Sequence, residues 1–364
     1  MQRETELPQP GRVVHVVGRV TDEVFSFLGP ATHALARSGR EQTVVMIDEP
    51  RHRRHVAGLH DSAELMLTPP MRSPFRQWQA MHRACDHAMR AGPLHAVHLH
   101  GLLAGLLGAN ALRSIGVEVP LFFSPHDSRS VSAWRALGRL PFVVTRPWLR
   151  DARHAAIVNL PKETHAFADW KATELVESPV GEAFFSLQRS ESRHPLIVTG
   201  GRMHGVRSPE KLAQLAVLLG GEDLRISFNW LGSVDDISRT RLNAAGVGVF
   251  ELADANEYAA RLSPGWIYVA PGGTRGFPLF LVEAMAAGLP CVALDNLQHR
   301  DVIRHGETGF LCTSERQMME CIATLVDNAE LRHRIGQAAR AAARRRFSED
   351  DFNKKLLAAY ALPT

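Results

Sequence analysis

The sequence predicts an α/β chain with two doubly wound, Rossmann-like domains, and three observations carry this prediction. Short apolar runs rich in β-branched residues alternate with longer helix-forming segments, which is typical of parallel strands covered by helices on both faces. The alternation lapses once, between residues 174 and 195, and then restarts. The length of 364 residues is large for one common core and suits two.

The first half opens on a β-α-β unit. The run RVVHVV at residues 12–17 ends at Gly18, and it is followed by the helix-like segment FLGPATHALARSG and a second run, TVVMID. The same pattern recurs with AVHLH at 96–100, PLFFS at 120–124 and AAIVN at 155–159. Each run predicts one buried parallel strand.

The second half restarts after a polar stretch bracketed by Pro179 and Pro195, where we place the linker. Strands are predicted by LIVTGG, RISFNWLG, VGVFEL, WIYVAP and PCVALD, and helices by PEKLAQLAVLLG and LFLVEAMAAG. A last helix with a Ser348 cap closes the chain. Doubly wound domains bind their ligands at the carboxyl ends of the strands, so the loops there are the candidate sites.

Composition limits the classes of function. Hydrophobic residues make up 45% and charged residues 22%, as in globular domains, and no apolar run approaches the ~20 residues that span a bilayer. The four cysteines form no CxxC pair, which predicts neither a disulfide framework nor a cysteine zinc site. Acids and prolines near the N-terminus do not fit a secretory signal, so we expect a cytoplasmic protein.

The net charge of +4 arises in the first half of the chain. This excess would attract an anionic acceptor or a phospholipid surface, and an ordinary arginine-rich surface explains it equally well. The segment from Trp134 to Arg150 mixes tryptophans with arginines, which suits an interface with anionic lipid, but Pro141 and Pro147 interrupt it. Peripheral contact with the inner face of the membrane and an ordinary crossing segment are therefore both open.

The most informative stretch is PGGTRGFPLFLVEAMAAGLPCVALD at 271–295, where a glycine-containing loop leads into a helix. Exposed N–H groups and aligned peptide dipoles at a helix N-terminus attract phosphate without a metal. Gly272, Gly273 and Gly276 permit close backbone approach. Glu283, inside the helix, can accept hydrogen bonds from two vicinal ribose hydroxyls, although a lone helical glutamate is more often a solvated charge.

A second segment, from Gly200 to Glu210, follows the first strand of the second domain and carries Arg202 and Arg207. Two cations in a strand-to-helix loop can both reach a diphosphate and neutralise the charge that develops as it leaves. Each arginine alone would be read as a surface charge. Their order and spacing relative to Glu283 favour the functional interpretation.

These segments resemble the donor signature of the family-four glycosyltransferases, the glycosyl transferases group 1. The match runs through Arg275-Gly276-Phe277-Pro278-Leu279, then Glu283-Ala284-Met285-Ala286, Gly288 and Pro290. The resemblance implies the GT-B fold, two Rossmann-like domains that face a central cleft, with the last helix returning to the first domain. We expect an acceptor-side domain at 1–180, a donor-binding domain at 181–345 and the returning helix at 346–364.

The resemblance also implies roles for the matched residues. Glu283 would bind the nucleotide ribose, and Arg202 and Arg207 would stabilise the leaving diphosphate. The donor loop would meet the sugar and the phosphates, so the donor-binding set is Gly18, Gly272, Gly273, Arg275, Gly276, Phe277, Pro278, Leu279 and Glu283. The reaction would retain the anomeric configuration, with no metal and no cofactor besides the nucleotide-sugar donor.

The sequence departs from the family pattern at two places. Arg275 stands where the family has a glutamate that contacts the transferred sugar, so the charge is inverted. Arg275 either selects an acidic sugar, binds a further phosphate by its bidentate fork or marks a lost activity. The family's Gly-Gly pair is also replaced, by Asp22 and Glu23, and Gly18 would compensate for it in part.

Histidines follow two apolar runs of the first half. His98 and His100 resemble the family's H-x-H positions, and His126 with Asp127 resembles its H-D positions. We take His126 as the catalytic candidate, able to hydrogen-bond the donor sugar or its phosphate, and interpret His98 and His100 as mainly structural. No HExxH motif or compact ligand set predicts a metal site.

The sequence therefore predicts a retaining glycosyltransferase that moves a sugar from a nucleotide-sugar donor to a saccharide or glycolipid acceptor, in cell-surface polysaccharide or glycolipid assembly. We expect a UDP-sugar first, with GDP- and ADP-sugars as alternatives, and no nucleic-acid partner. One alternative is a catalytically silent GT-B protein that binds a nucleotide sugar or a partner enzyme. Another is a sugar-nucleotide epimerase or hydrolase, which would need further acids for proton transfer.

Overall fold

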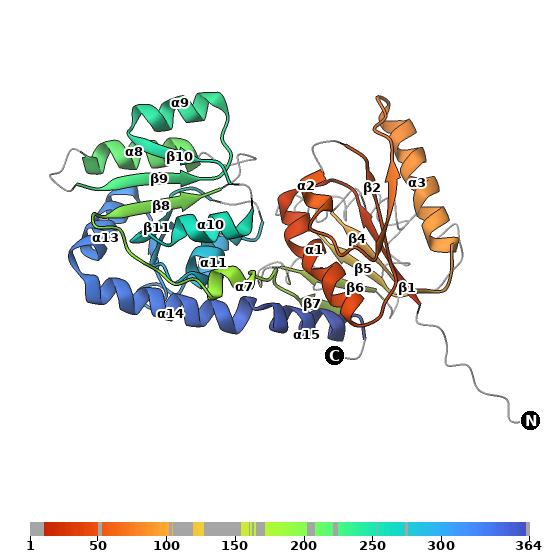
Figure 1. Cartoon of the computed structure of the whole chain (residues 1–364). Coiled ribbons are helices and arrows are strands. Elements are labelled where there is room, and N and C mark those ends of the chain that lie inside the picture. Colours follow the sequence, from red (N-terminus) through yellow and green to blue (C-terminus); the bar gives the residue numbers. More distant parts are fainter. Residues whose placement is uncertain are drawn as a thin grey trace, which may run out of the picture. The chain divides into compact units, whose positions relative to one another are not determined.

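The computed structural model describes residues 11–49, 53–101, 104, 119–126, 154–159, 161, 164, 172–201, 208–220, 225–252, 254–273 and 276–361. The chain divides into two compact units (Figure 1). Unit 1 comprises Met1–Ser178 with Phe352–Thr364, and unit 2 comprises Pro179–Asp351. Each unit has its own sheet and its own hydrophobic core.

Unit 1 contains a parallel sheet in the strand order β3-β2-β1-β4-β5-β6-β7. Its strands are β1 (Arg12–Val17), β2 (Gln42–Ile47), β3 (Ala63–Thr68), β4 (Leu94–His100), β5 (Leu121–Ser124), β6 (His154–Val158) and β7 (Ala172–Leu175). The order reverses between β1 and β4, which pair directly. This reversal is the topological switch point, where doubly wound sheets open a crevice for ligands.

Helices cover both faces of this sheet. They are α1 (Asp22–Arg37), α2 (Arg53–Val56), α3 (Pro74–Arg90) and α15 (Glu349–Ala359). The hydroxyls of Thr21 and Ser73 cap α1 and α3. α3 packs Met81, Cys85 and Met89 on one face of the sheet, while α1 and α15 pack on the other.

Unit 2 repeats the same plan in the strand order β10-β9-β8-β11-β12-β13. Its strands are β8 (Leu196–Gly200), β9 (Ser227–Leu231), β10 (Val247–Phe250), β11 (Ile267–Ala270), β12 (Cys291–Leu294) and β13 (Phe310–Cys312). Its helices are α7 (Glu182–Phe185), α8 (Ser208–Gly220), α9 (Asp236–Ala244), α10 (Ala255–Leu262), α11 (Leu279–Ala286), α12 (Leu297–Val302), α13 (Glu315–Asp327) and α14 (Ala329–Phe347). The switch point here lies between β8 and β11.

The last helix belongs to unit 1 from Phe352 onward. The ring of Phe352 meets Phe27 of α1 edge-on at 5.3 Å, and Tyr360 meets Phe122 of β5 edge-on at 4.6 Å. Two Rossmann-like sheets and a C-terminal helix that returns to the first domain confirm the predicted fold class. Among the described helices, none has the length and apolar character to cross a membrane.

Candidate functional site

The carboxyl edge of the second sheet brings glycines close to aromatic side chains at the switch point. A Cβ added to Gly200, the last residue of β8, would lie 2.5 Å from the hydroxyl of Tyr258 and 2.8 Å from the ring of Phe280. Gly232, with φ of 133°, packs directly against the carbonyl of Gly201. Only glycine fits these positions, because neighbouring groups of the protein fill the space that a Cβ would take.

The predicted donor loop lies at the same edge. It follows β11, with Gly272 buried and Gly273 next to the amide of Asn296, the N-cap residue of α12. Gly276, Phe277 and Pro278 are buried where the chain enters α11. No side chain caps α11, because its N-cap residue is a proline. At this N-terminus the Leu279 N–H bonds to the carbonyl of Phe277 at 2.9 Å. N–H groups in the first turn of a helix are the groups that an anion site uses.

Glu283 lies on α11, half-buried. Its carboxylate lies near the phenols of Tyr258 and Tyr268. Burial is the main cause that raises the pKa of Tyr258 well above its ordinary value, followed by the neighbouring Tyr268 and the charge of Glu283. Burial likewise raises the pKa of Tyr268. Both phenols therefore stay neutral and act as hydrogen-bonding groups beside Glu283.

Tyr258 and Tyr268 were missed by the sequence reasoning. The hydroxyl of Tyr268 donates to the carbonyl of Gly200 at 3.1 Å and accepts the Gly200 N–H at 3.3 Å, so it joins β11 to the end of β8. The hydroxyl of Tyr258 donates to the carbonyl of Phe280 at 3.5 Å. A tyrosine inside the apolar run WIYVAP was the available signal, because a buried phenol needs a hydrogen-bond partner.

Three predicted residues of this site, Arg202, Arg207 and Arg275, lie outside the described residues. The others are brought together at one edge of the sheet: Gly272, Gly273, Gly276, Phe277, Pro278, Leu279 and Glu283. They lie on the loop after β11 and on α11, which contacts β11 and β12.

The corresponding edge of the first sheet holds Gly18 and His126. The Gly18 N–H donates to the carbonyl of His100 at 3.3 Å, and the Gly101 N–H donates to the carbonyl of Ser124 at 2.8 Å, so the ends of β1, β4 and β5 are tied together. His126 follows β5 with φ of 61°, a left-handed conformation uncommon for a residue with a side chain. Asp22, in place of the family's glycine pair, begins α1 and bonds to His55 at 2.6 Å.

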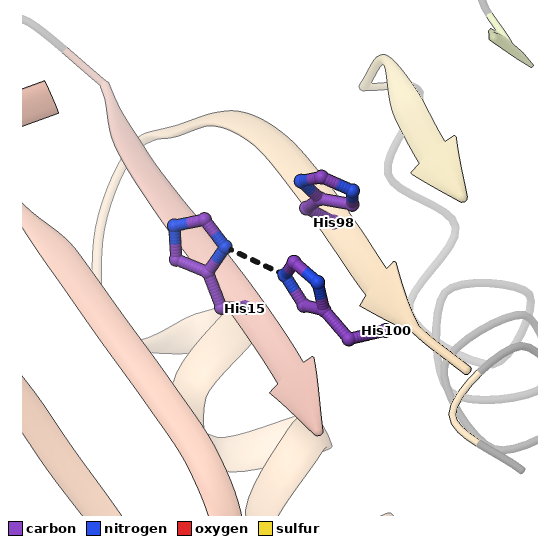
Figure 2. Close-up of side chains that lie close together, drawn as sticks. All are labelled: His15, His98 and His100. Carbon is purple, nitrogen blue, oxygen red and sulfur yellow. Dashed lines mark hydrogen bonds between the residues drawn. The ribbon is translucent and has the colours of Figure 1, made fainter. Parts of the chain in front are cut away.

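Four histidines form a buried cluster behind this edge. His15 on β1 lies opposite His98 on β4, and His100 follows two residues later on the same face (Figure 2). Nδ1 of His15 bonds to Nε2 of His100 at 3.1 Å, and Nδ1 of His100 bonds to Nε2 of His126 at 2.9 Å. The sequence reasoning did not single out His15, although its place at the centre of an apolar run was a signal.

These four side chains are at most 3% exposed. Burial lowers the pKa of His15 and of His126 to about 3, and burial together with the neighbouring histidines lowers the pKa of His98 and His100 well below the ordinary value. All four imidazoles are therefore neutral at pH 7. A neutral imidazole offers one N–H donor and one acceptor nitrogen.

Neutral imidazoles are also metal ligands, and ring nitrogens of His15, His98 and His100 lie within 4.8 Å of one another. However, Nδ1 of His98 bonds to the hydroxyl of Tyr360 at 2.5 Å, and its Nε2 bonds to the hydroxyl of Ser124 at 2.8 Å. A metal would have to break one of these bonds. The geometry favours a hydrogen-bonded cluster over a metal site.

Comparison with known proteins decides the class of the chain. Residues 182–342 match the family described as Glycosyl transferases group 1, and this match spans most of unit 2. The second unit belongs to this family. The predicted resemblance is confirmed, and the chain is a glycosyltransferase.

Characterised relatives of this glycosyltransferase extend over both units. It is 28% identical to phosphatidyl-myo-inositol mannosyltransferase of Mycobacterium leprae over 302 residues, which cover 78% of this chain and 75% of the relative. It is 26% identical to GDP-mannose-dependent alpha-mannosyltransferase of Mycolicibacterium smegmatis, across 93% of this chain and 90% of the relative.

Solved structures share its fold along nearly the whole chain. A glycosyltransferase from Rickettsia africae superposes with a TM-score of 0.73 at 12% identity, covering 97% of this chain and 98% of that one. HepE of Anabaena, in complex with UDP and glucose, superposes with a TM-score of 0.72 at 13% identity, covering 96% and 99%. At these identities the likeness concerns the fold alone.

Proposed function

We propose that this glycosyltransferase moves a hexose from a nucleotide diphosphate sugar to a glycolipid acceptor, with GDP-mannose as the first donor to test. The observation that carries the proposal is the donor edge of unit 2, where a glycine loop, an uncapped helix N-terminus and Glu283 lie together. Relatives of nearly the same length are GDP-mannose-dependent mannosyltransferases, which moves GDP-mannose ahead of the UDP-sugar expected from sequence.

Each part of the donor has a partner in this scheme. Glu283 accepts hydrogen bonds from the ribose hydroxyls, and the N-terminus of α11 receives the phosphates. Arg202 and Arg207 neutralise the departing diphosphate, which is the role a metal plays in other transferases. In unit 1, His126 is the proposed catalytic residue. The reaction proposed is retaining and independent of a metal.

Arg275 decides between a working and a silent site. If Arg275 has a functional role in place of the family's sugar-contacting glutamate, the wild type should transfer sugar from donor to acceptor. The Arg275→Glu variant should then lose this activity. If the site has decayed, the wild type is inactive and Arg275→Glu gains transfer. Donor consumption without acceptor would instead identify a hydrolase or epimerase. Product analysis by mass spectrometry with GDP-mannose, UDP-glucose and a lipid extract separates the three outcomes.

A glycolipid acceptor requires contact with a lipid surface, and α3 offers a suitable face. Phe75 is 65% exposed and Trp78 is 38% exposed, and their rings stack at 6.3 Å. Exposed Met71 and two arginines, Arg72 and Arg76, lie beside them in the sequence, and no acidic residue occurs between 65 and 85. Aromatic rings among arginines suit an anionic phospholipid surface. The segment from Trp134 to Arg150, our first candidate for this contact, lies outside the described residues.

Vesicle sedimentation tests the membrane contact. The wild type should sediment with vesicles that contain phosphatidylglycerol and not with phosphatidylcholine alone, and Phe75→Ser with Trp78→Ser should abolish sedimentation. Ile237→Ser is the matched control, because Ile237 is 67% exposed and belongs to unit 2. Equal sedimentation of the wild type and the α3 variant would contradict this contact and leave the donor assignment intact.

A further inference from the structure

Two cysteine thiols of unit 2 lie in contact, on residues that the proposed donor site does not use. The thiol of Cys312, at the end of β13, donates to the sulfur of Cys321 on α13, and the two sulfurs are 3.7 Å apart. A disulfide holds its sulfurs about 2.05 Å apart, so these two need to approach by less than about 2 Å to form one. Adjustment of the two side chains and of the turn between them can supply a movement of this size.

The turn between β13 and α13 brings the two cysteines together. Ser314, the N-cap residue of α13, accepts the Gln317 N–H at 3.2 Å, and the Gln317 side chain accepts the Thr313 N–H at 2.8 Å. Such reciprocal bonds satisfy N–H groups at the start of a helix and hold its first turn in place. α13 then packs Ile322 into the core of unit 2, and Cys321 lies at the border of this packed face. The fold itself therefore places Cys321 against the end of β13.

The two thiols differ in exposure and in acidity. Cys312 is 0% exposed, whereas Cys321 is partly exposed. The hydrogen bond from Cys312 lowers the pKa of Cys321, and the same bond together with burial raises the pKa of Cys312. An accessible thiol of lowered pKa is the reactive one, because the thiolate is the nucleophile. Cys321 is therefore the attacking member of the pair, and Cys312 is the partner behind it.

The other two cysteines, Cys85 on α3 and Cys291 on β12, have a different environment. Both are 0% exposed, and burial raises the pKa of both thiols, that of Cys85 to about 12. Cys85 belongs to unit 1, and the Cys291 thiol donates to the carbonyl of Leu289 at 3.4 Å. A buried, neutral thiol reacts slowly with oxidants. These two cysteines therefore serve as internal standards of low reactivity.

We propose that Cys321 and Cys312 are a redox-active pair that closes to a disulfide when the protein meets a peroxide. The Cys321 thiolate attacks one peroxide oxygen, the O–O bond breaks, and a sulfenic acid forms with release of hydroxide, which takes up the proton that Cys321 had lost. The Cys312 sulfur then attacks the sulfenic sulfur. The S–S bond forms as the S–O bond breaks, and the departing hydroxide leaves as water with the Cys312 proton.

This sequence oxidises two thiols and reduces one peroxide to two molecules of water. The product ties α13 covalently to β13, which is an edge strand of the second sheet. A dithiol reductant reverses it by thiol–disulfide exchange. Intracellular disulfides of mesophiles are commonly of this transient, redox-sensing kind.

Tryptic peptides read the bond directly, because Arg316 lies between the two cysteines. Cleavage places Cys312 in the peptide 305–316 and Cys321 in the peptide 317–332. The full chain is treated with hydrogen peroxide, its remaining thiols are alkylated in denaturant, and the digest is analysed by mass spectrometry. We expect the two peptides to be joined after peroxide and to separate again after dithiothreitol.

The variants identify the role of each sulfur. In Cys312→Ser, Cys321 should stop at the sulfenic acid, which dimedone traps. Cys85→Ala is the matched control, because it removes a buried thiol of unit 1 and should leave the joined peptides unchanged. The peptide of Cys291 should carry only the alkyl group in every sample.

Peptides of Cys312 and Cys321 that stay separate after peroxide would overturn the proposal. A link from either of them to Cys85 or Cys291 would overturn it as well, because it would show that the contact of 3.7 Å does not direct the reaction. Should Cys312→Ser not fold, the wild-type digest alone decides. The reaction needs no donor and no acceptor, so its outcome is independent of the transferase assay.

Discussion

At the scale of single residues, the donor edge of unit 2 depends on contacts that only glycine allows. Gly200 packs against the hydroxyl of Tyr258 and against the ring of Phe280, which lies in the first turn of α11. Tyr268 holds Gly200 from the neighbouring strand by two hydrogen bonds. The position of the helix N-terminus relative to β8 is thus set by two buried phenols, which bond to main-chain groups.

We predict that Gly200→Ala lowers the free energy of unfolding by about 1–3 kcal/mol, because the added methyl overlaps buried groups that cannot move without strain. The displacement of Phe280 should also weaken nucleotide binding. Gly220→Ala is the control, since a Cβ there meets nothing within 4 Å. Chemical denaturation and calorimetry check both effects, and equal stability of the two variants would refute the packing argument.

Sequence reasoning reached some of these residues and not others. Gly272, Gly276 and Glu283 could be named because their order along the chain is a motif. Tyr268 and His15 could not, since each lies inside an apolar run and acquires its role from a partner far away in sequence: Gly200 for Tyr268 and His100 for His15. A linear pattern identifies residues that act on a ligand, whereas supporting contacts depend on which strands become neighbours.

At the scale of elements, the central strands were predicted well, whereas among the four edge strands β3, β7, β10 and β13 only β10 was predicted, from VGVFEL. The runs at 12–17 and 196–201 match β1 and β8 closely, because both strands are central and nearly all apolar. β3 and β7 form the two edges of the first sheet, and both were missed. In β3 only Ala63 and Thr68 are buried, and Glu64, Leu65 and Leu67 are exposed. The strand therefore lacks the continuous buried apolar run that marks a central strand.

The histidines of β1, β4 and the end of β5 predict an acid-sensitive first unit. Their pKa values in the folded state lie below the ordinary value of 6.5, to about 3 for His15 and His126. The contribution of this cluster to the free energy of unfolding is therefore fully present above pH 6.5. It falls as the pH drops from 6.5 toward 3, because in this range only the unfolded chain takes up protons. Each histidine contributes up to about 1.4 kcal/mol per pH unit.

Thermal unfolding at pH 7.5, 6.5 and 5.5 checks this dependence. The melting temperature should fall steeply below pH 6.5, and His126→Gln should make the decline shallower by removing one of the four groups. A melting temperature that stays constant between pH 7.5 and 5.5 would show that the cluster is not buried as described.

At the scale of the whole molecule, the chain is two Rossmann-like units in which the strand order repeats and the last helix returns to the first unit. The alternation of apolar runs and helical segments predicted this class. It did not predict which strands pair at the two switch points, since pairing across a reversal is decided by packing between distant segments. Both candidate sites lie at such a reversal, β1 with β4 and β8 with β11.

The returning helix should stabilise unit 1 directly. Phe352 is 1% exposed and its ring meets Phe27 of α1, so we predict that Phe352→Ala lowers the free energy of unfolding by about 3–5 kcal/mol. Lys354 lies two residues later on the exposed face of the same helix, so Lys354→Ala should change the free energy of unfolding little. Comparable losses in both variants would mean that helix content and not packing on α1 sets the stability.

The central claim is that unit 2 binds a nucleotide sugar through Glu283 at the carboxyl edge of its sheet, and calorimetry with GDP-mannose and UDP-glucose tests it most directly. We predict saturable binding of one donor that weakens at least about tenfold in Glu283→Gln, because hydrogen bonds from ribose to a charged acceptor are lost. Glu320→Gln, on exposed α13, should bind as the wild type does. Equal affinity of the wild type and Glu283→Gln, or no binding of either donor, would contradict the account.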